Sequence, residues 1–180
     1  MLNQIRYPNN RTDTFTWTDD PDPLLASHET LVSVGAERTT RTRQFQYDEY
    51  GRMVMLVEPN NVATVYRYND TGYVETILEG VPVTSDDTPE AIVEDSASKI
   101  TTLSYYISGQ IQRVIDTRGT AYNLSWTPSG GLSSVQTSDG SSITYSYDER
   151  GRIISTNDRG QQSIYTYNGL DLVSDSRNAL

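Results

Sequence analysis

The sequence contains no cysteine, one lysine (Lys99) and one histidine (His28) among its 180 residues. Without cysteine the chain can form neither disulfides nor thiol nucleophiles, and zinc sites of the cysteine type are excluded. Only 14 Lys and Arg residues stand against 24 Asp and Glu residues, which gives a formal net charge of −10. Such a chain has no basic surface able to release counterions from a phosphate backbone, so nucleic acid is excluded as a main partner.

Long apolar runs are also missing. No stretch reaches the ~18 apolar residues that a membrane span needs, so we expect no membrane span. The N-terminus, MLNQIRYPNN, lacks the basic start and apolar run of a signal peptide, so we expect no signal peptide in this chain. Hydrophobic residues make up only 35% of the sequence, but 13 Tyr and 2 Trp add large apolar areas, which predicts a folded chain.

An aromatic residue recurs about every 21 residues, and a glycine stands four residues after each of the first five aromatics. The aromatics are Tyr47, Tyr68, Tyr105, Trp126, Tyr147 and Tyr167, and the glycines are Gly51, Gly72, Gly109, Gly130 and Gly151. Asp171 takes the glycine position of the last unit. A fixed period of this length indicates a repeat architecture.

Each unit has the alternation of a β-strand. In the stretch SITYSY, Ile143, Tyr145 and Tyr147 fall on one face and serine or threonine falls on the other. Asp48 or Asp148 then opens a turn by bonding the backbone two residues on, and the glycine three positions later closes the turn with a positive φ. A second turn recurs half a period later, in PNN (59–61), TRG (117–119), SDG (138–140) and DRG (158–160).

These patterns predict an all-β fold of antiparallel β-hairpin repeats, with about a dozen strands in one meander that forms a curved or spiralling β-strip. We expect a single repeat array over 1–180. A degraded unit occupies 1–20, an insertion 20–39, repeats 40–79, an acidic insertion 79–98 and further repeats 99–175. The acidic insertion has six acidic residues and no basic one, and we expect it to be a loop on the rim. The other insertion could carry an extra strand, for which LVSV is the best candidate.

The motifs YDEYGRM (47–53), YDERGRI (147–153), YNDTGYV (68–74) and YNGLDLV (167–173) resemble the tyrosine-aspartate (YD) repeats of the Rhs family, which also occur in toxin-complex shells and teneurins. The resemblance covers residues 40–175 and the degraded copy at 1–20. It implies a long β-strip that spirals into a hollow shell, which often encloses a toxin. The chain departs from the family because it is far shorter than a complete shell, and because DPDPLL (20–25) lacks the glycine of the family's self-cleavage segment.

The residues of the repeated turn are expected to be structural. Besides the aromatics and glycines above they are Asp48, Arg52, Asp148 and Arg152, and the two arginines are expected to pair with an acidic residue on the neighbouring hairpin. Tyr73, Tyr106 and Tyr122 fall outside the repeated positions and are the candidates for glycan contact. His28 is expected to be solvated, and there is no Gly-x-Ser-x-Gly elbow, so no catalytic residue, metal ligand or cofactor is predicted.

The favoured interpretation is a non-enzymatic structural YD-repeat module of an Rhs-type β-shell, serving encapsulation or a surface scaffold. The alternative is an extracellular binding module for a glycan or a cell-surface receptor. The expected partners are flanking YD repeats or another copy, joined through open sheet edges, and an enclosed toxin domain or a surface glycan. We expect a bacterial protein that is extracellular or on the cell surface.

Overall fold

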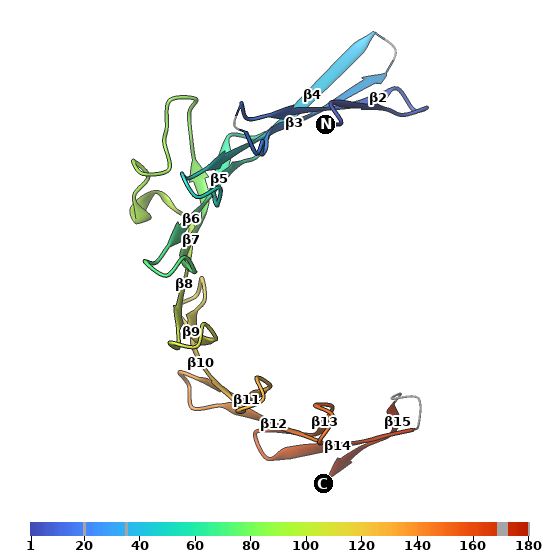
Figure 1. Cartoon of the computed structure of the whole chain (residues 1–180), viewed down its shortest axis with the longest axis vertical. Coiled ribbons are helices and arrows are strands. Elements are labelled where there is room, and N and C mark those ends of the chain that lie inside the picture. The colour runs from blue at the N-terminus through green and yellow to red at the C-terminus, as the bar shows by residue number, and fades with distance from the viewer. Residues whose placement is uncertain (20, 35, 169–172, 180) are drawn as a thin grey trace. The chain divides into compact units, whose positions relative to one another are not determined.

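The computed structural model describes residues 1–19, 21–34, 36–168 and 173–179 (Figure 1). The described residues form fifteen β-strands and one 3-10 helix of three residues, and every strand pairing is antiparallel. The predicted all-β antiparallel fold class is confirmed, with a few more strands than expected. No helix among the described residues is long enough to cross a membrane.

The chain divides into two compact units, residues 1–100 and 101–180. In each unit the strands pair in the order of the sequence. The elements of the first unit are β1 (Gln4–Arg6), β2 (Arg11–Trp17), β3 (Leu25–Val34), β4 (Glu37–Tyr47), β5 (Met53–Val57), β6 (Val62–Tyr68), β7 (Val74–Pro82) and η1 (Glu94–Ser96). Those of the second are β8 (Lys99–Tyr105, which begins just before the boundary), β9 (Ile111–Ile115), β10 (Ala121–Trp126), β11 (Leu132–Thr137), β12 (Ser142–Tyr147), β13 (Ile153–Asp158), β14 (Gln161–Tyr167) and β15 (Val173–Ala179).

The two faces of the second unit differ as the alternation predicts. In β12, Ile143, Tyr145 and Tyr147 are half-buried, whereas Ser142, Thr144 and Ser146 are exposed. The register also shifts by one residue immediately before the motif aromatic, for example between Ser146 and Tyr147. The same shift precedes Trp17, Tyr47, Tyr68, Tyr105, Trp126 and Tyr167. A β-bulge of this kind accompanies a turn that ends in a left-handed glycine.

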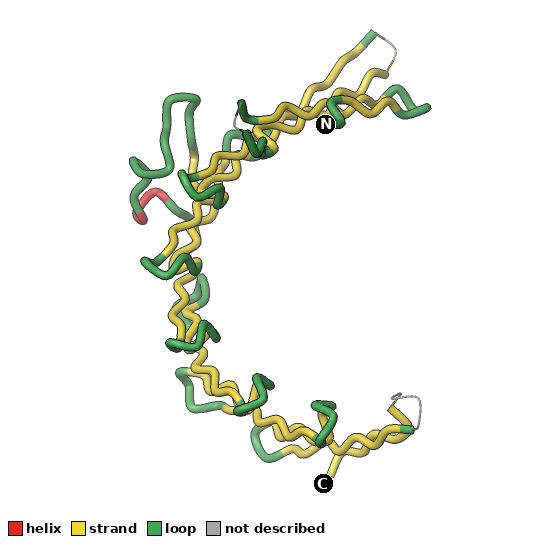
Figure 2. Tube along the Cα trace, in the orientation of Figure 1, coloured by secondary structure: helices red, strands yellow, loops and turns green. Residues whose placement is uncertain are grey.

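The largest cluster of buried residues lies in the first unit. It comprises Met55, Val57, Ala63, Val65, Leu78 and Val81 from β5 to β7, together with Val83 and Ile92 from the acidic insertion. Figure 2 shows the insertion as a loop, with its one helical turn, beside the strands. The insertion is a loop, as expected, but it also folds back and buries Val83 and Ile92 on β5 to β7, which the sequence did not predict. Of the buried hydrophobic residues in the part of the chain that the structure describes, Ala121 alone lies in the second unit.

The segment 20–39 also differs from the expected insertion. LVSV lies in β3, as predicted, but β3 is ten residues long and β4 begins already at Glu37. His28 lies in the middle of β3, where its ring stacks on Phe15 with centroids 4.8 Å apart. The expectation of a solvated histidine is therefore wrong, because pairing with β2 places the ring against an aromatic neighbour.

Candidate functional site

Asp48 organises the turn of the first full motif. Its backbone N–H donates to the Arg52 carbonyl at 2.9 Å, and the Gly51 N–H donates to the Asp48 carbonyl at 3.0 Å. The Asp48 carboxylate accepts hydrogen bonds from the N–H groups of Tyr50 (3.0 Å) and Arg52 (2.9 Å). Gly51 has a φ of +74°, a left-handed conformation that favours glycine. One carboxylate and one glycine thus hold the turn in its conformation.

Arg52 joins this turn to the next motif. Its Nε donates to Asp48 Oδ2 at 2.7 Å, and its Nη2 lies 2.6 Å from the same oxygen. The guanidinium carbon lies 4.3 Å from the ring centroid of Tyr68, the aromatic of the following motif. The predicted pairing with an acid on the neighbouring hairpin is therefore wrong. The turn brings the motif's own aspartate within reach, and the neighbouring hairpin supplies an aromatic ring instead.

The motif at 147–153 has the same arrangement. Arg152 Nε donates to Asp148 Oδ2 at 2.7 Å, and the guanidinium lies 4.4 Å from the Tyr167 ring centroid. Hydrogen bonds from the Arg152 backbone and guanidinium lower the pKa of Asp148. For Asp48, burial would raise the pKa, but the hydrogen bonds from Arg52 and Tyr50 outweigh it and the pKa is lowered. Both carboxylates therefore stay ionised at a lower pH than an unperturbed aspartate does.

Five of the motif aromatics also donate a hydrogen bond to a backbone carbonyl of the preceding motif, which we call the motif-to-motif hydrogen bond. The acceptor is the first residue of the strand that leaves the preceding turn. The pairs are Tyr47 hydroxyl to Leu25 (3.1 Å), Tyr68 to Met53 (2.7 Å), Trp126 Nε1 to Ile111 (2.7 Å), Tyr147 to Leu132 (2.8 Å) and Tyr167 to Ile153 (2.5 Å). Burial raises the pKa of Tyr47 and of Tyr68, so both hydroxyls keep the proton that they donate.

The weaker motifs keep the turn with other residues in the aspartate position. Asn69 Oδ1 accepts from the N–H groups of Thr71 and Tyr73, and Thr127 Oγ1 accepts from the N–H of Gly131. Their glycines, Gly72, Gly109 and Gly130, have φ between +85° and +89°. Tyr105 ends β8 before the third turn. Asp171, in the glycine position of the last unit, lies outside the described residues.

The three glycan candidates each form hydrogen bonds within the chain. The Tyr73 N–H donates to Asn69, and the Tyr106 hydroxyl donates to the Leu124 carbonyl at 3.0 Å. The side chains of Tyr73 and Tyr106 are partly exposed, at 43% and 38%. Tyr73 belongs to the first unit, and Tyr106 and Tyr122 belong to the second. Glycan contact at these residues stays a prediction.

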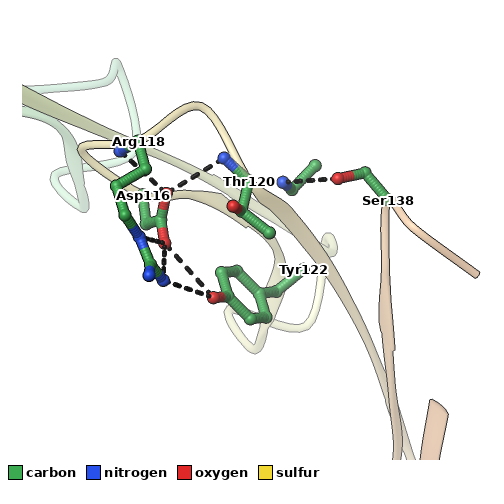
Figure 3. Close-up of polar contacts among 6 residues, drawn as sticks. Asp116, Arg118, Thr120, Tyr122 and Ser138 are labelled. Carbon is green, nitrogen blue, oxygen red and sulfur yellow. Dashed lines mark hydrogen bonds and ion pairs between the residues drawn. The ribbon is translucent and has the colours of Figure 1, made fainter. Parts of the chain in front are cut away.

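Tyr122 is part of a polar network around the second type of turn (Figure 3). Asp116 accepts hydrogen bonds from the backbone N–H groups of Arg118 and Thr120, both at 2.9 Å, and from the Tyr122 hydroxyl at 3.2 Å. Its Oδ2 also lies 2.9 Å from Arg118 Nη2. The bond from the Arg118 side chain, followed by the backbone bonds, lowers the pKa of Asp116 to about 2. Sequence reasoning found this turn through its TRG but missed the aspartate that precedes it.

Fold and motifs together define a protein of antiparallel β-hairpin repeats, in which consecutive hairpins are fastened to each other. Residues 126–161 match the family model described as RHS Repeat, so this segment carries an Rhs repeat and the resemblance found in the sequence is confirmed. A search of the curated proteins finds no match.

Several solved structures have a similar fold. A crystal structure of TcdB2-TccC3-Cdc42 aligns over 94% of this chain and 9% of its own, with 14% identity and a TM-score of 0.72. A crystal structure of TcdB2-TccC3 aligns over 92% and 9%, with 14% identity and a TM-score of 0.70. A Photorhabdus luminescens Tc holotoxin pore aligns over 98% and 11%, with 16% identity and a TM-score of 0.59. The chain thus spans about a tenth of the length of these structures.

Proposed function

We propose that this chain is a structural module that forms part of the wall of an Rhs-type β-shell. The observation that carries the proposal is the motif-to-motif hydrogen bond, which fastens each hairpin to the one before it within a unit. The tyrosine hydroxyls and the two motif arginines are used in these internal contacts. Side chains repeated in this way serve the sheet as a whole rather than one local binding site.

The comparisons support an encapsulating role in a toxin system. The fold is shared with TcdB2-TccC3 over more than nine-tenths of this chain, and one of the similar structures is a Tc holotoxin pore. That likeness supports the proposal of a wall that encloses a toxin domain, in a bacterial protein that acts outside the cell. The cargo itself would be carried by a further part of such a complex.

An open sheet edge provides the means of extension. β1 is the first strand in the sheet order, and it pairs with β2 alone. The Phe15 N–H donates to the Asn3 carbonyl, and the Tyr7 N–H donates to the Arg11 carbonyl. Because ladder bonds alternate along an antiparallel strand, the backbone groups of Gln4 and Arg6 face away from β2. A flanking strand, from a longer repeat array or from another copy, would pair with these groups.

The mass in solution tests this edge. We expect light scattering after size exclusion to give masses that rise above 20.2 kDa as the protein concentration increases. Arg6→Pro removes one outward N–H and should give lower masses than the parent at each concentration, because pairing through the β1 edge is lost. Arg6→Ala is the matched control, because it loses the same side chain but keeps the N–H, and it should associate as the parent does. A parent chain of 20.2 kDa at every concentration would overturn pairing through the edge.

A further inference from the structure

A polar groove lies on one face of β2, β3 and β4 and of the turn between β5 and β6. The charged and titratable residues of its lining are Arg11, His28, Glu37, Arg41, Arg43 and Glu58. The strand register explains why they meet. Phe15 stands opposite His28, which stands opposite Arg43, and in the next row Asp13 stands opposite Thr30, which stands opposite Arg41. Directly opposed residues share a sheet face, so three strands contribute to the same surface.

Arg11 is held in a fixed orientation at this groove. Its Nε and Nη2 donate to the two oxygens of Asp13 at 2.9 and 2.7 Å, and its guanidinium lies 5.0 Å from the Tyr7 ring centroid. Asp13 is only 3% exposed and also accepts a hydrogen bond from Thr30 at 3.0 Å. The hydrogen bond from Arg11 lowers the pKa of Asp13. A guanidinium oriented in this way loses little side-chain entropy when it binds an anion.

Arg41 is the cation of the groove without an acidic partner. Arg43 pairs with Glu58 at 2.9 Å and Arg11 pairs with Asp13, whereas Arg41 forms no ion pair among the described residues. Beneath Arg11, His28 Nε2 is buried 3.7 Å from Asp13 Oδ2 and forms no hydrogen bond among the described residues. In a chain with a net charge of −10, a guanidinium left free beside two others marks a site for an anionic group.

The acidic insertion lies on the other face of the same unit. Val57, which packs against the insertion, stands opposite Gln44, so the insertion covers the Gln44 face, while the neighbouring Arg43 faces the groove. The exposed carboxylates of the insertion are those of Asp86, Glu90, Glu94 and Asp95. The segment between Val83 and Ala97 contains no basic residue. The insertion therefore cannot reach the groove of its own molecule, but it can reach the groove of another molecule.

We propose that this groove binds the acidic insertion of a second copy of the chain, with carboxylates of the insertion on Arg41 and Arg11. The two contact surfaces differ and lie on opposite faces of one unit, so each molecule can offer one surface to a neighbour on either side. The contact is electrostatic and uses side chains, and it is therefore independent of pairing through the β1 edge.

A labelled synthetic peptide with the sequence of residues 84–96, TSDDTPEAIVEDS, tests the groove without involving a sheet edge. We expect fluorescence anisotropy to show binding to the full chain that weakens as salt is raised from about 0.1 M to about 1 M, where the Debye length falls from about 10 Å to about 3 Å. Arg41→Glu should weaken binding at least about tenfold, since a like charge then faces the peptide. Arg113→Glu makes the same charge change on an exposed residue of the second unit and should leave binding within about twofold.

Three results would each overturn the proposal. One is equal binding of a peptide in which every Asp and Glu is replaced by Asn or Gln, which would show that the apolar residues bind. Another is equal affinity of the Arg41→Glu chain and the parent for the peptide, and the third is no binding of the peptide to the parent. In the full protein, Arg41→Glu mixed with a chain carrying Asp86→Lys and Glu90→Lys should associate more strongly than either variant alone. If the parent chain does not bind the peptide but the Arg6→Ala chain still associates, the groove is rejected and the proposed structural role stands, because that association uses the β1 edge.

Discussion

At the residue scale, the arginine of the full motif contacts two repeats at once. Arg52 bonds the aspartate of its own turn and covers the ring of the next motif aromatic, Tyr68. In the motif where Gly131 stands in place of the arginine, the ring of the next motif aromatic lies close to the backbone. A Cβ on Gly131 would lie only 3.2 Å from ring atoms of Tyr147. The aromatic is therefore packed against the preceding turn in both cases, by a guanidinium in one and by bare backbone in the other.

The first prediction concerns the motif-to-motif hydrogen bond. Tyr147→Phe removes the donor to the Leu132 carbonyl, a contact of 2.8 Å, and should lower the free energy of unfolding by about 1 kcal/mol. Urea unfolding followed by far-UV circular dichroism measures the change. Tyr145→Phe is the matched control, two residues earlier on the same strand and also half-buried. Equal losses in the two variants would show that the hydrogen bond contributes nothing of its own.

At the element scale, the acidic insertion acts as the cover of an apolar sheet face. Its carboxylates lie outward, while Val83 and Ile92 are 8% and 6% exposed and pack on Met55, Val65 and Leu78. The insertion is fastened further where Arg67 Nη2 donates to the Ile92 carbonyl. Without this cover, a patch of side chains that are now almost fully buried would face water.

The second prediction concerns this cover. Ile92→Ala should destabilise the first unit by about 2 kcal/mol, at the lower end for a buried isoleucine because a surface loop can partly close the cavity. It should also increase binding of a hydrophobic dye. Val93→Ala, at the neighbouring residue that is 59% exposed, should change neither quantity. A similar effect of both substitutions would mean that the insertion does not depend on the burial of Ile92.

The turns could be predicted from the sequence because their causes are local. Asp48, Gly51 and their counterparts at 148 and 151 act within four residues, so the chain itself carries the whole signal. The partner of Arg52 was predicted wrongly because the aspartate of its own turn and an acidic residue of the neighbouring hairpin are both candidates. Only the folded turn shows that the first of them lies within reach. The cover was missed for a different reason. Val83 and Ile92 stand among acidic residues, and their burial depends on an apolar face supplied by β5 to β7.

At the scale of the whole molecule, aspartates in turns of both units share one electrostatic property. The pKa is lowered for Asp48 and Asp148, and it is lowered to about 2 for Asp116 and for Asp139, where hydrogen bonds from Thr137 and Ser141 are the cause. A folded-state pKa below the unfolded value means that the ionised group stabilises the fold. That contribution is complete above pH 4 and is lost as the pH falls toward 2.

The third prediction follows from this property. The urea midpoint should be almost constant between pH 7 and pH 5 and should fall between about pH 4 and about pH 2. A chain with Asp116→Asn and Asp139→Asn should be less stable at pH 7 and should lose less stability on acidification, because two of the titrating groups are gone. A midpoint that does not change down to pH 2 would show that the turn carboxylates do not stabilise the fold.

The motif-to-motif hydrogen bond always runs from a later aromatic to an earlier carbonyl. Tyr68 needs Met53, and Tyr167 needs Ile153, but neither acceptor needs its donor in order to form its own turn. On a ribosome the earlier hairpin emerges first, and at about 5–20 residues per second a repeat of this length takes seconds to synthesise. A hairpin closes in about 1–10 μs, so each repeat can pack on a preceding hairpin that has already folded while the next repeat is still being translated. The direction of this bond therefore matches the direction of protein synthesis, and the sheet can grow during translation without waiting for its C-terminal strands.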